Sequence, residues 1–333
     1  MRNVLVTGAS RGIGLAIARK LAEAAFNVIA VARREGDELR AAIAEAKQGN
    51  LHFRACDLSA IDELPTFVKT LRDEFGAIYG LINNAGLGTE GLLATMHNSD
   101  IEALVRLNVL SPVILTKYIV RHMMADGEGR VVNISSIIAS TGYNGLSVYG
   151  ATKAAATGFT RSLAREVGKL GITVNAIAPG FIDTELTQSL GGEGREKIAK
   201  RSALRRLPEA DDVARMVEYL FSDGGRNITG SVLTIDAGNT ARTQHPCGFH
   251  TAILFGCYIG RTIARDPIGV SGAIHPNVPA SRLPRHAGQP VRRVRVGDAD
   301  WRRTPVSPAQ RGSAHQCAGL RWCRGLCRSR QPH

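Results

Sequence analysis

Three side chains between positions 136 and 153 have the types and the spacing that proton transfer needs. Tyr149 and Lys153 are four residues apart, so on a helix they lie one turn apart on the same face. An ammonium close to a phenol stabilises the phenolate and can lower the phenol pKa by about 1–3 units. This would let Tyr149 give or take a proton near neutral pH. Ser136 follows an apolar run at residues 131–134, and its hydroxyl could hold a substrate oxygen beside the phenol.

A purely structural role is the alternative for each of these residues. A Tyr-x-x-x-Lys pair arises often by chance, and a serine after an apolar strand commonly makes a turn or caps a helix. The surrounding elements must therefore decide whether the three side chains meet.

Short apolar runs alternate with helix-forming segments through residue 241. Strands are expected at residues 4–7, 27–32, 51–55, 79–82, 130–134, 172–178 and 232–235, and helices at 15–25, 35–48, 59–75, 101–124, 147–169 and 208–221. This order predicts one α/β domain at 1–241, with a doubly wound, seven-stranded parallel sheet of the Rossmann type. Ligands bind beyond the carboxyl ends of the strands in such sheets. The segments that fall there are Gly8–Gly14, Asp57, Asn83–Gly86, Ser136 and Pro179-Gly180.

The first of these segments is typical of a dinucleotide site. A strand, the glycine-rich turn 8–14 and a helix follow one another, so backbone N–H groups and the helix N-terminus can face a pyrophosphate. Arg33 and Arg34 follow the second strand, where NAD-binding chains carry an acidic residue for the ribose, and Arg11 adds a further positive charge. The pattern favours NADP(H), whose 2′-phosphate an arginine accommodates; solvated surface arginines are the alternative.

The positive charge of the chain is concentrated at its C-terminal end. The net charge of +13 divides into +2 for residues 1–243 and +11 for residues 244–333, which contain 14 Arg and three Asp. Five of the six cysteines also lie beyond residue 243, and Cys56 alone precedes it, which fits a domain in a reducing compartment. No apolar stretch is expected to reach the ~18–20 residues of a membrane span, so a cytoplasmic protein without a membrane partner is predicted.

Residues 242–333 have no sustained hydrophobic period and are predicted to be an irregular, disordered basic extension. Three roles are compatible with this composition. The segment could contact acidic partners or nucleic acid, it could bind zinc through His315, Cys317, Cys323 and Cys327, or it could have no selected structure. The composition favours the last, so neither a metal site nor a nucleic-acid partner is expected.

The motifs taken together resemble the short-chain dehydrogenase/reductase family over residues 1–241. They are Thr7-Gly8-x-x-x-Gly12-Ile13-Gly14, Asn83-Asn84-Ala85-Gly86, Asn108, Ser136, Tyr149-x-x-x-Lys153 and Pro179-Gly180. Within that family, segments 162–167, 171–175 and 230–238 are similar to those of 3-oxoacyl-acyl-carrier-protein reductases, although members with other substrates share them.

The resemblance implies a role for each matching residue. Tyr149 would be the general acid, Lys153 would hold the nicotinamide ribose, Ser136 would orient the substrate carbonyl, and Asn108 would break its helix and hold a water that relays protons to Lys153. The cofactor contacts it implies are Gly8, Ser10, Arg11, Gly12, Ile13, Gly14, Arg33, Arg34, Asp57, Leu58, Asn84, Ala85, Gly86, Tyr149, Lys153, Pro179, Gly180, Ile182 and Thr184.

The function implied is NADPH-dependent reduction of a carbonyl, with a 3-oxoacyl thioester of acyl carrier protein or coenzyme A as the favoured substrate in fatty acid biosynthesis. A sugar, steroid or small ketone, or a non-catalytic NADP(H)-binding regulator, are the alternatives. The resemblance also implies a homotetramer or homodimer that pairs helices 98–124 and 147–169. Residues 185–207 are expected to be a loop-like lid, and Leu87, Ile138, Tyr143 and Asn144 are candidate pocket residues.

Overall fold

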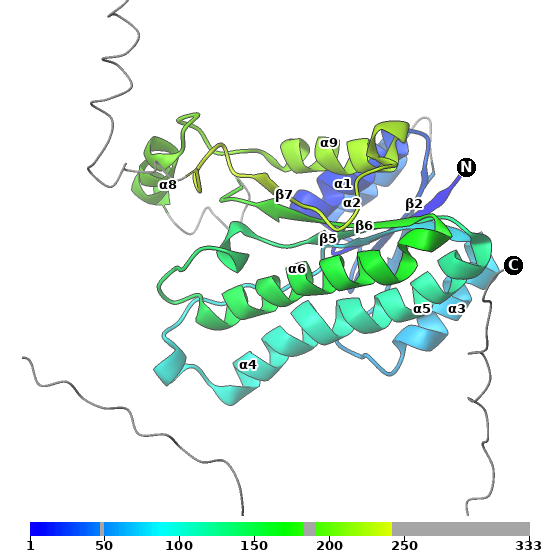
Figure 1. Ribbon diagram of the computed structural model, residues 1–333, viewed down its shortest axis with the longest axis horizontal. Coiled ribbons are helices and arrows are strands. Elements are labelled where there is room, and N and C mark those ends of the chain that lie inside the picture. The colour runs from blue at the N-terminus through cyan, green and yellow to red at the C-terminus, as the bar shows by residue number, and fades with distance from the viewer. Residues whose placement is uncertain (47–49, 183–190, 242–333) are drawn as a thin grey trace, which may run out of the picture. The chain divides into compact units, whose positions relative to one another are not determined.

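A parallel sheet of seven strands organises the protein. The computed structural model describes residues 1–46, 50–182 and 191–241. Its strands run β3-β2-β1-β4-β5-β6-β7 across the sheet, and every neighbouring pair is parallel (Figure 1). From β1 the strands are added toward one edge of the sheet as far as β3, and from β4 onward they are added toward the other edge. Sheets of this type bind ligands at the point between β1 and β4 where this order reverses. The predicted fold is confirmed, whereas all proposals for residues 242–333 lie outside the described residues.

The elements follow the predicted order closely. The strands are β1 (Asn3–Thr7), β2 (Asn27–Ala32), β3 (Leu51–Ala55), β4 (Ile78–Asn83), β5 (Gly129–Ile134), β6 (Ile172–Pro179) and β7 (Val232–Ile235). The main helices are α1 (Gly12–Glu23), α2 (Asp37–Glu45), α3 (Leu64–Phe75), α4 (Asn98–Val105), α5 (Ser111–Asp126), α6 (Ser147–Val167), α8 (Gly191–Arg201) and α9 (Ala210–Phe221). Short 3₁₀ turns flank several of them.

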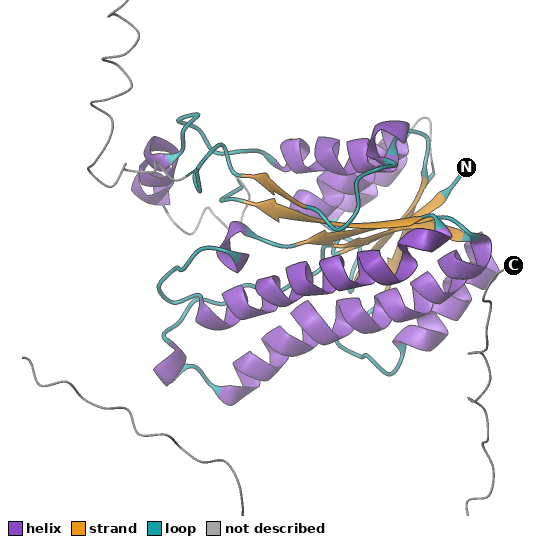
Figure 2. Cartoon of the chain, in the orientation of Figure 1, coloured by secondary structure: helices purple, strands orange, loops and turns teal. Residues whose placement is uncertain are grey.

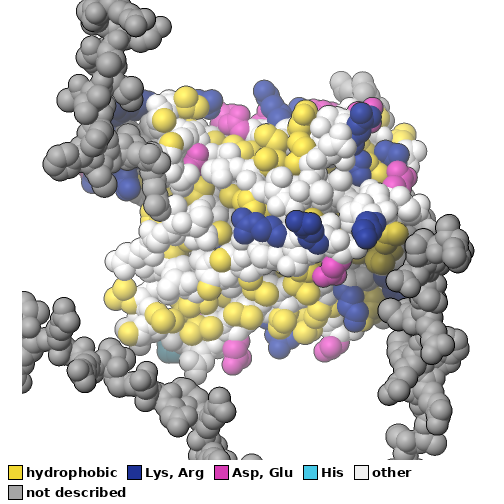
Figure 3. Space-filling view, in the orientation of Figure 1, with side chains coloured by type: hydrophobic (Ala, Val, Ile, Leu, Met, Phe, Trp, Pro, Cys, Tyr) yellow, Lys and Arg dark blue, Asp and Glu magenta, His cyan; other side chains and the backbone are white. Residues whose placement is uncertain are grey.

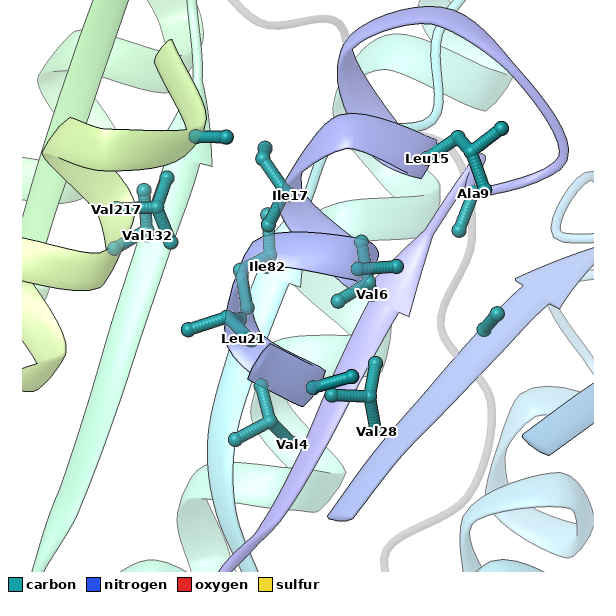
Figure 4. Close-up of a cluster of buried hydrophobic side chains, with 14 of the residues drawn as sticks. Val4, Val6, Ala9, Leu15, Ile17, Leu21, Val28, Ile82, Val132 and Val217 are labelled. Carbon is teal, nitrogen blue, oxygen red and sulfur yellow. The ribbon is translucent and has the colours of Figure 1, made fainter. Parts of the chain in front are cut away.

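The sheet is covered on both faces because alternate side chains of each strand point to opposite sides. On β1, Val4 and Val6 pack against α1 and α9, while Leu5 packs on the other side against α3, α5 and α6. Figure 2 shows these two helical layers with the strands between them, and Figure 4 shows the first cluster around Val6, Ile17 and Val217. Most residues of the buried strands are apolar, and the buried polar exceptions include Thr7, Asn83 and Asn133.

Two helices differ from the sequence-based expectation. The third helix begins at Leu64 rather than at Ser59, because Pro65 fits the first turn of a helix but not its interior. The prediction that residues 185–207 form a loop was wrong for α8. The three glycines near the start of this segment favoured a loop in the sequence analysis, but the ion pairs Glu193–Lys197 and Glu196–Lys200 support a helix. Residues 185–190 lie outside the described residues.

The continuous helical segment Asn98–Asp126 is long and apolar enough to cross a membrane by length and composition. The segment includes Arg106 and Lys117, so it is not the uninterrupted apolar stretch that the sequence analysis did not expect to find. The inner face of the segment is buried against the sheet through Leu115, Ile119 and Met123. A core helix of a soluble domain has the same composition, so this single segment is weak evidence for a span.

Candidate active site

Tyr149, Lys153 and Ser136 lie together at the carboxyl end of β5, as the sequence predicted. Ser136 follows β5, and Tyr149 and Lys153 occupy the first two turns of α6. The Ser136 hydroxyl lies close enough to the Tyr149 phenol to lower the pKa of that phenol. The Lys153 ammonium lies 5.7 Å from the centroid of the Tyr149 ring. A carbonyl oxygen that reached this point would meet both hydroxyls.

The expected low pKa of the Tyr149 phenol is not found for the protein chain by itself. Burial raises the Tyr149 pKa above its ordinary value, and the nearby Ser136 hydroxyl offsets this only in part. The Lys153 Nζ donates to the Ile134 carbonyl oxygen at 3.0 Å. Burial lowers the pKa of Lys153 itself to about 8. Tyr149 and Lys153 are thus buried away from water, where the charged form of either side chain is unfavourable.

Asn108 lies in a local break of the long helix, as expected. Residues Arg106–Leu110 form a π-helical turn between α4 and α5, a feature that often marks functional positions. The Asn108 amide donates to the Leu87 carbonyl at 2.9 Å and accepts from the Leu87 N–H at 2.8 Å. It also donates to Thr152 Oγ1 at 3.1 Å. The side chain therefore fixes the loop after β4 to the first turns of α6.

Several residues that hold the site were missed by the sequence analysis as site residues. Ser135 Oγ donates to the Lys153 carbonyl at 2.9 Å, and Thr152 Oγ1 donates to the Tyr149 carbonyl at 2.7 Å. Thr7 Oγ1 accepts from the N–H groups of Asn84 and Ala85. Apart from Thr152, these bonds join segments far apart in the chain, and local sequence spacing does not reveal them.

A buried amide network lies behind Lys153. Thr160 donates to the Ala156 carbonyl at 2.8 Å, so it must accept from Asn133 Nδ2, which lies 2.8 Å away. This turns Asn133 Oδ1 toward Asn83, whose Nδ2 donates to it at 2.8 Å. The orientation of the Asn83 amide is thereby fixed, and its Oδ1 is buried without a hydrogen-bond partner in the described part of the chain.

A cavity of about 30 Å³ adjoins this network. Asn83, Asn108, Asn133 and Lys153 line its polar side. Such a space can hold one ordered water, which needs polar partners like these. The residues present thus suit the proton relay expected beside Lys153, with Asn83 as an additional polar group.

The glycine-rich turn fits a dinucleotide, because side chains are sterically excluded from it. A Cβ on Gly14 would lie 2.2 Å from the Gly8 carbonyl oxygen, and one on Gly8 would lie 2.8 Å from the Ala85 Cα. Gly8 and Gly12 also have positive φ angles of 66° and 59°, which glycine adopts without strain. The Asn84 amide donates to the carbonyls of Thr7 and Gly8 and so joins the turn to the end of β4.

The predicted cofactor residues around this turn have the expected placement. Arg33 and Arg34 are exposed directly after β2, and the structure shows no ion pair for either within its described residues. Asp57 follows β3 and accepts from the Ser59 N–H at 2.9 Å, and Leu58 is buried behind it. Ser10, Arg11 and Ile13 lie in the turn or at its helical end and are exposed or half-buried.

The segment after β6 closes the other side of the site. The Gly180 N–H donates to the Ile235 carbonyl at 2.8 Å, and a Cβ on Gly180 would contact Asp236 at 2.7 Å. Pro179 and Ile182 are buried, and Ile182 packs in the core below the site. Thr184 lies outside the described residues, so its contact remains a prediction.

The candidate pocket residues lie on the loops that follow β4 and β5. The ring of Tyr143 lies 5.5 Å from that of Phe181 between centroids, Ile138 is buried, and Leu87 is 39% exposed. Asn144 is exposed. The arrangement as a whole offers a proton donor, an adjacent hydroxyl and a buried ammonium beside a cradle for a dinucleotide, which suits proton transfer coupled to hydride transfer.

Comparisons with known proteins agree with this geometry. Residues 2–193 match the family described as short chain dehydrogenase. The 3-oxoacyl-[acyl-carrier-protein] reductase of Vibrio harveyi is 38% identical over 234 residues, which cover 70% of this chain and 95% of the relative. The enzyme of that name from Escherichia coli K12 is also 38% identical, over 235 residues, with the same two coverages.

Solved structures show the same similarity. A short-chain dehydrogenase from Burkholderia cenocepacia in complex with NADP has a TM-score of 0.66 and 33% identity, and covers 72% of this chain and 98% of its own. A gluconate 5-dehydrogenase from the same organism, in complex with NADP and tartrate, has a TM-score of 0.69 and 28% identity, with coverages of 72% and 96%.

Proposed function

Because the chain belongs to the short-chain dehydrogenase family, we propose that it is an NADP(H)-dependent oxidoreductase that reduces a 3-oxoacyl thioester to the 3-hydroxyacyl form. The observation that carries the chemistry is the meeting of Ser136, Tyr149 and Lys153 beside the glycine turn. The choice of substrate is supported by the names of the relatives at 38% identity. Fatty acid biosynthesis in the cytoplasm is the setting that this substrate implies.

NADP(H) is the proposed cofactor, in agreement with the NADP present in two solved relatives. The residues that would hold it are Gly8–Gly14 at the pyrophosphate, Arg33 and Arg34 at the 2′-phosphate, and Asp57 with Leu58 near the adenine. Asn84–Gly86, Lys153, Pro179 and Gly180 would hold the rest. When bound, the reduced cofactor supplies the hydride that the carbonyl carbon receives.

The side chains of the protein supply the proton and the orientation. Ser136 and Tyr149 would donate hydrogen bonds to the carbonyl oxygen, and the phenol proton would pass to that oxygen as its negative charge develops. Lys153 would stabilise the phenolate that remains and return a proton to it. The cavity behind Lys153 would supply that proton through an ordered water.

The surroundings of the phenol favour an acyl group over a polyol. Ile138, Tyr143 and Phe181 would line the acyl pocket, with the rings of Tyr143 and Phe181 5.5 Å apart between centroids. Leu87 and Leu92 are exposed on the loop after β4 and would add apolar surface. Burial of apolar chain surface is favourable by about 25 cal/mol per Å². A sugar would leave its hydroxyls unpaired against these side chains, which disfavours the polyol alternative suggested by the gluconate 5-dehydrogenase.

We also propose that the catalytic domain ends near residue 241 and that it forms a homodimer or homotetramer. Val105, Leu110, Val113 and Met124 are exposed along α4 and α5, and Figure 3 shows the apolar surface that runs over these helices. An apolar strip of this kind suits a second copy of the chain. Light scattering tests this: a monomeric mass for the full chain would contradict it.

The function itself is tested by the loss of nicotinamide absorbance with acetoacetyl-CoA. Turnover should be clearly faster with NADPH than with NADH. If neither cofactor supports turnover but NADPH still binds, the enzyme acts on another carbonyl or the chain is a regulator. Turnover with NADH alone would contradict the assigned cofactor.

A further inference from the structure

A strongly basic surface adjoins the opening of the site and takes no part in the chemistry described above. Residues 191–206 comprise α8 and the turn after it, and they hold six Lys or Arg and two Glu. The α8 basic patch is defined here as Lys197, Lys200, Arg201, Arg205 and Arg206, all of which are exposed. The rest of residues 1–243 is nearly neutral, so this concentration of charge is local.

The patch is fixed to the edge of the sheet where the site opens. Leu204 donates its N–H to the Ala237 carbonyl at 3.0 Å, and Asn239 donates to Ser202 Oγ at 3.2 Å. Ile235, the last residue of β7 before the turn with Ala237 and Asn239, accepts from the Gly180 N–H through its carbonyl oxygen. Figure 1 shows α8 beyond the end of the sheet toward which β6 and β7 point. The basic surface therefore lies on the side of the molecule from which a substrate enters.

The charges of the patch are only partly compensated. Lys200 pairs with Glu196 at 2.6 Å, while the Lys197–Glu193 and Arg206–Asp212 distances are both 3.9 Å. Exposed pairs of this kind contribute little stability. Arg201 makes no ion pair or hydrogen bond through its guanidinium in the described part of the chain. It is thus available to an anion.

The local backbone is built to hold the patch in place. Arg205 has a φ of 55°, a left-handed conformation that costs an arginine roughly 1 kcal/mol or more. Its guanidinium donates to the Lys200 carbonyl at 2.6 Å and its N–H donates to the Ser202 carbonyl, so it closes the C-terminal end of α8. Next to it, Leu204 is 61% exposed and adds apolar surface.

We propose that the α8 basic patch binds the phosphate of the phosphopantetheine arm that carries the thioester, with Arg201 as the main contact. The arm must leave the site on the substrate side when the thioester carbonyl is beside Tyr149. Guanidinium groups bind phosphate through paired, charge-assisted hydrogen bonds, and Leu204 offers apolar surface to the pantetheine chain. Coenzyme A and acyl carrier protein share this arm. The inference rests on the proposed function and specifies how its substrate is recognised.

The test compares two thioesters on the full-length protein. Acetoacetyl-CoA has the phosphorylated arm, whereas acetoacetyl-N-acetylcysteamine has the same acetoacetyl thioester and no phosphate. Arg201→Glu should lower kcat/KM for acetoacetyl-CoA about tenfold and change that for the cysteamine thioester less than twofold. Arg201→Gln should have a smaller effect of the same selectivity, and added salt should reduce the difference, because the contact is electrostatic.

Lys69→Glu on α3 is the matched control. It makes the same change in net charge as Arg201→Glu, at an exposed position on a different helix. It should leave kcat/KM unchanged for both thioesters. The C-terminal arginines are present in every variant. A difference in kcat/KM between an Arg201 variant and the control therefore reports on α8.

Other outcomes would overturn the proposal. Equal losses for both thioesters would show that Arg201 supports the structure, and no loss for either would show that it contacts no phosphate. A loss confined to acetoacetyl-[acyl carrier protein] would assign the patch to the acidic protein surface instead of the arm. If the unaltered chain reduces neither acetoacetyl-CoA nor the cysteamine thioester, the proposed function itself fails. If the unaltered chain reduces the cysteamine thioester but not acetoacetyl-CoA, the proposed reduction of a 3-oxoacyl thioester stands and the proposed phosphate contact of the α8 basic patch is refuted.

Discussion

Gly14 should tolerate no side chain, because the cofactor cradle closes around it. In Gly14→Ala the new Cβ would lie 2.2 Å from the Gly8 carbonyl oxygen and 2.5 Å from Asn84 Nδ2. Relief requires a shift of roughly 1 Å in backbone that is fixed on both sides, and overpacking of this kind costs about 1–3 kcal/mol. Loss of the bond from Asn84 to the Gly8 carbonyl, now 3.1 Å long, adds about 1 kcal/mol.

The expected result is a lower free energy of unfolding, by about 2–4 kcal/mol, together with a dissociation constant for NADPH raised at least tenfold. Urea unfolding and fluorescence titration measure the two quantities. Gly158→Ala on α6 is the control, since nothing lies within 4 Å of its added Cβ, and it should stabilise the helix by about 0.5–1 kcal/mol with unchanged NADPH affinity. If Gly14→Ala matched the unaltered chain in both measurements, the steric account of the cradle would be refuted.

Three further predictions concern the groups around the cradle. Arg33→Ala should weaken NADPH binding about tenfold and leave NADH binding unchanged, because only NADPH has the 2′-phosphate; equal losses in titration would disprove the assignment. The pKa of Lys153 is lowered to about 8, so between pH 8 and 10.5 the folded chain binds fewer protons than the unfolded chain. The free energy of unfolding should therefore rise with pH in that window by on the order of 3 kcal/mol relative to Lys153→Met, and parallel pH profiles would contradict this. Asn83→Ala should lower the free energy of unfolding by about 1–3 kcal/mol, because Asn133 Oδ1 loses its donor; unchanged urea unfolding would show that the amide network contributes nothing.

The parts of the fold and site that depend on local pattern could be predicted from the sequence. The alternation of apolar strands and helices predicted the order of the elements. The rule that ligands bind at the carboxyl ends of strands placed Gly8–Gly14 and Ser136 at one edge of the sheet, where the structure has them. The start of α3 was predicted less closely: a helix was expected from residue 59, whereas Pro65 in the first turn places its beginning at Leu64.

What the sequence did not reveal depends on contacts between distant segments. Asn108 holds Leu87 across 21 residues, and Asn83 meets Asn133 across 50. The environment of Tyr149 was likewise not predictable, because burial by several elements outweighs the nearby lysine that the spacing supplied. The helix α8 was missed because glycines dominate its first turn, whereas its ion pairs lie further along.

The most direct test of the account is the single-atom change Tyr149→Phe, which removes the hydroxyl that lies near Ser136. Reduction of acetoacetyl-CoA should fall by at least about 10²-fold, the lower range for loss of a general acid, while NADPH binds with nearly unchanged affinity. Both are measured on the same preparation, by absorbance loss and by fluorescence titration. Turnover that persists at the original rate, with NADPH bound, would contradict the assignment of Tyr149 as the proton donor.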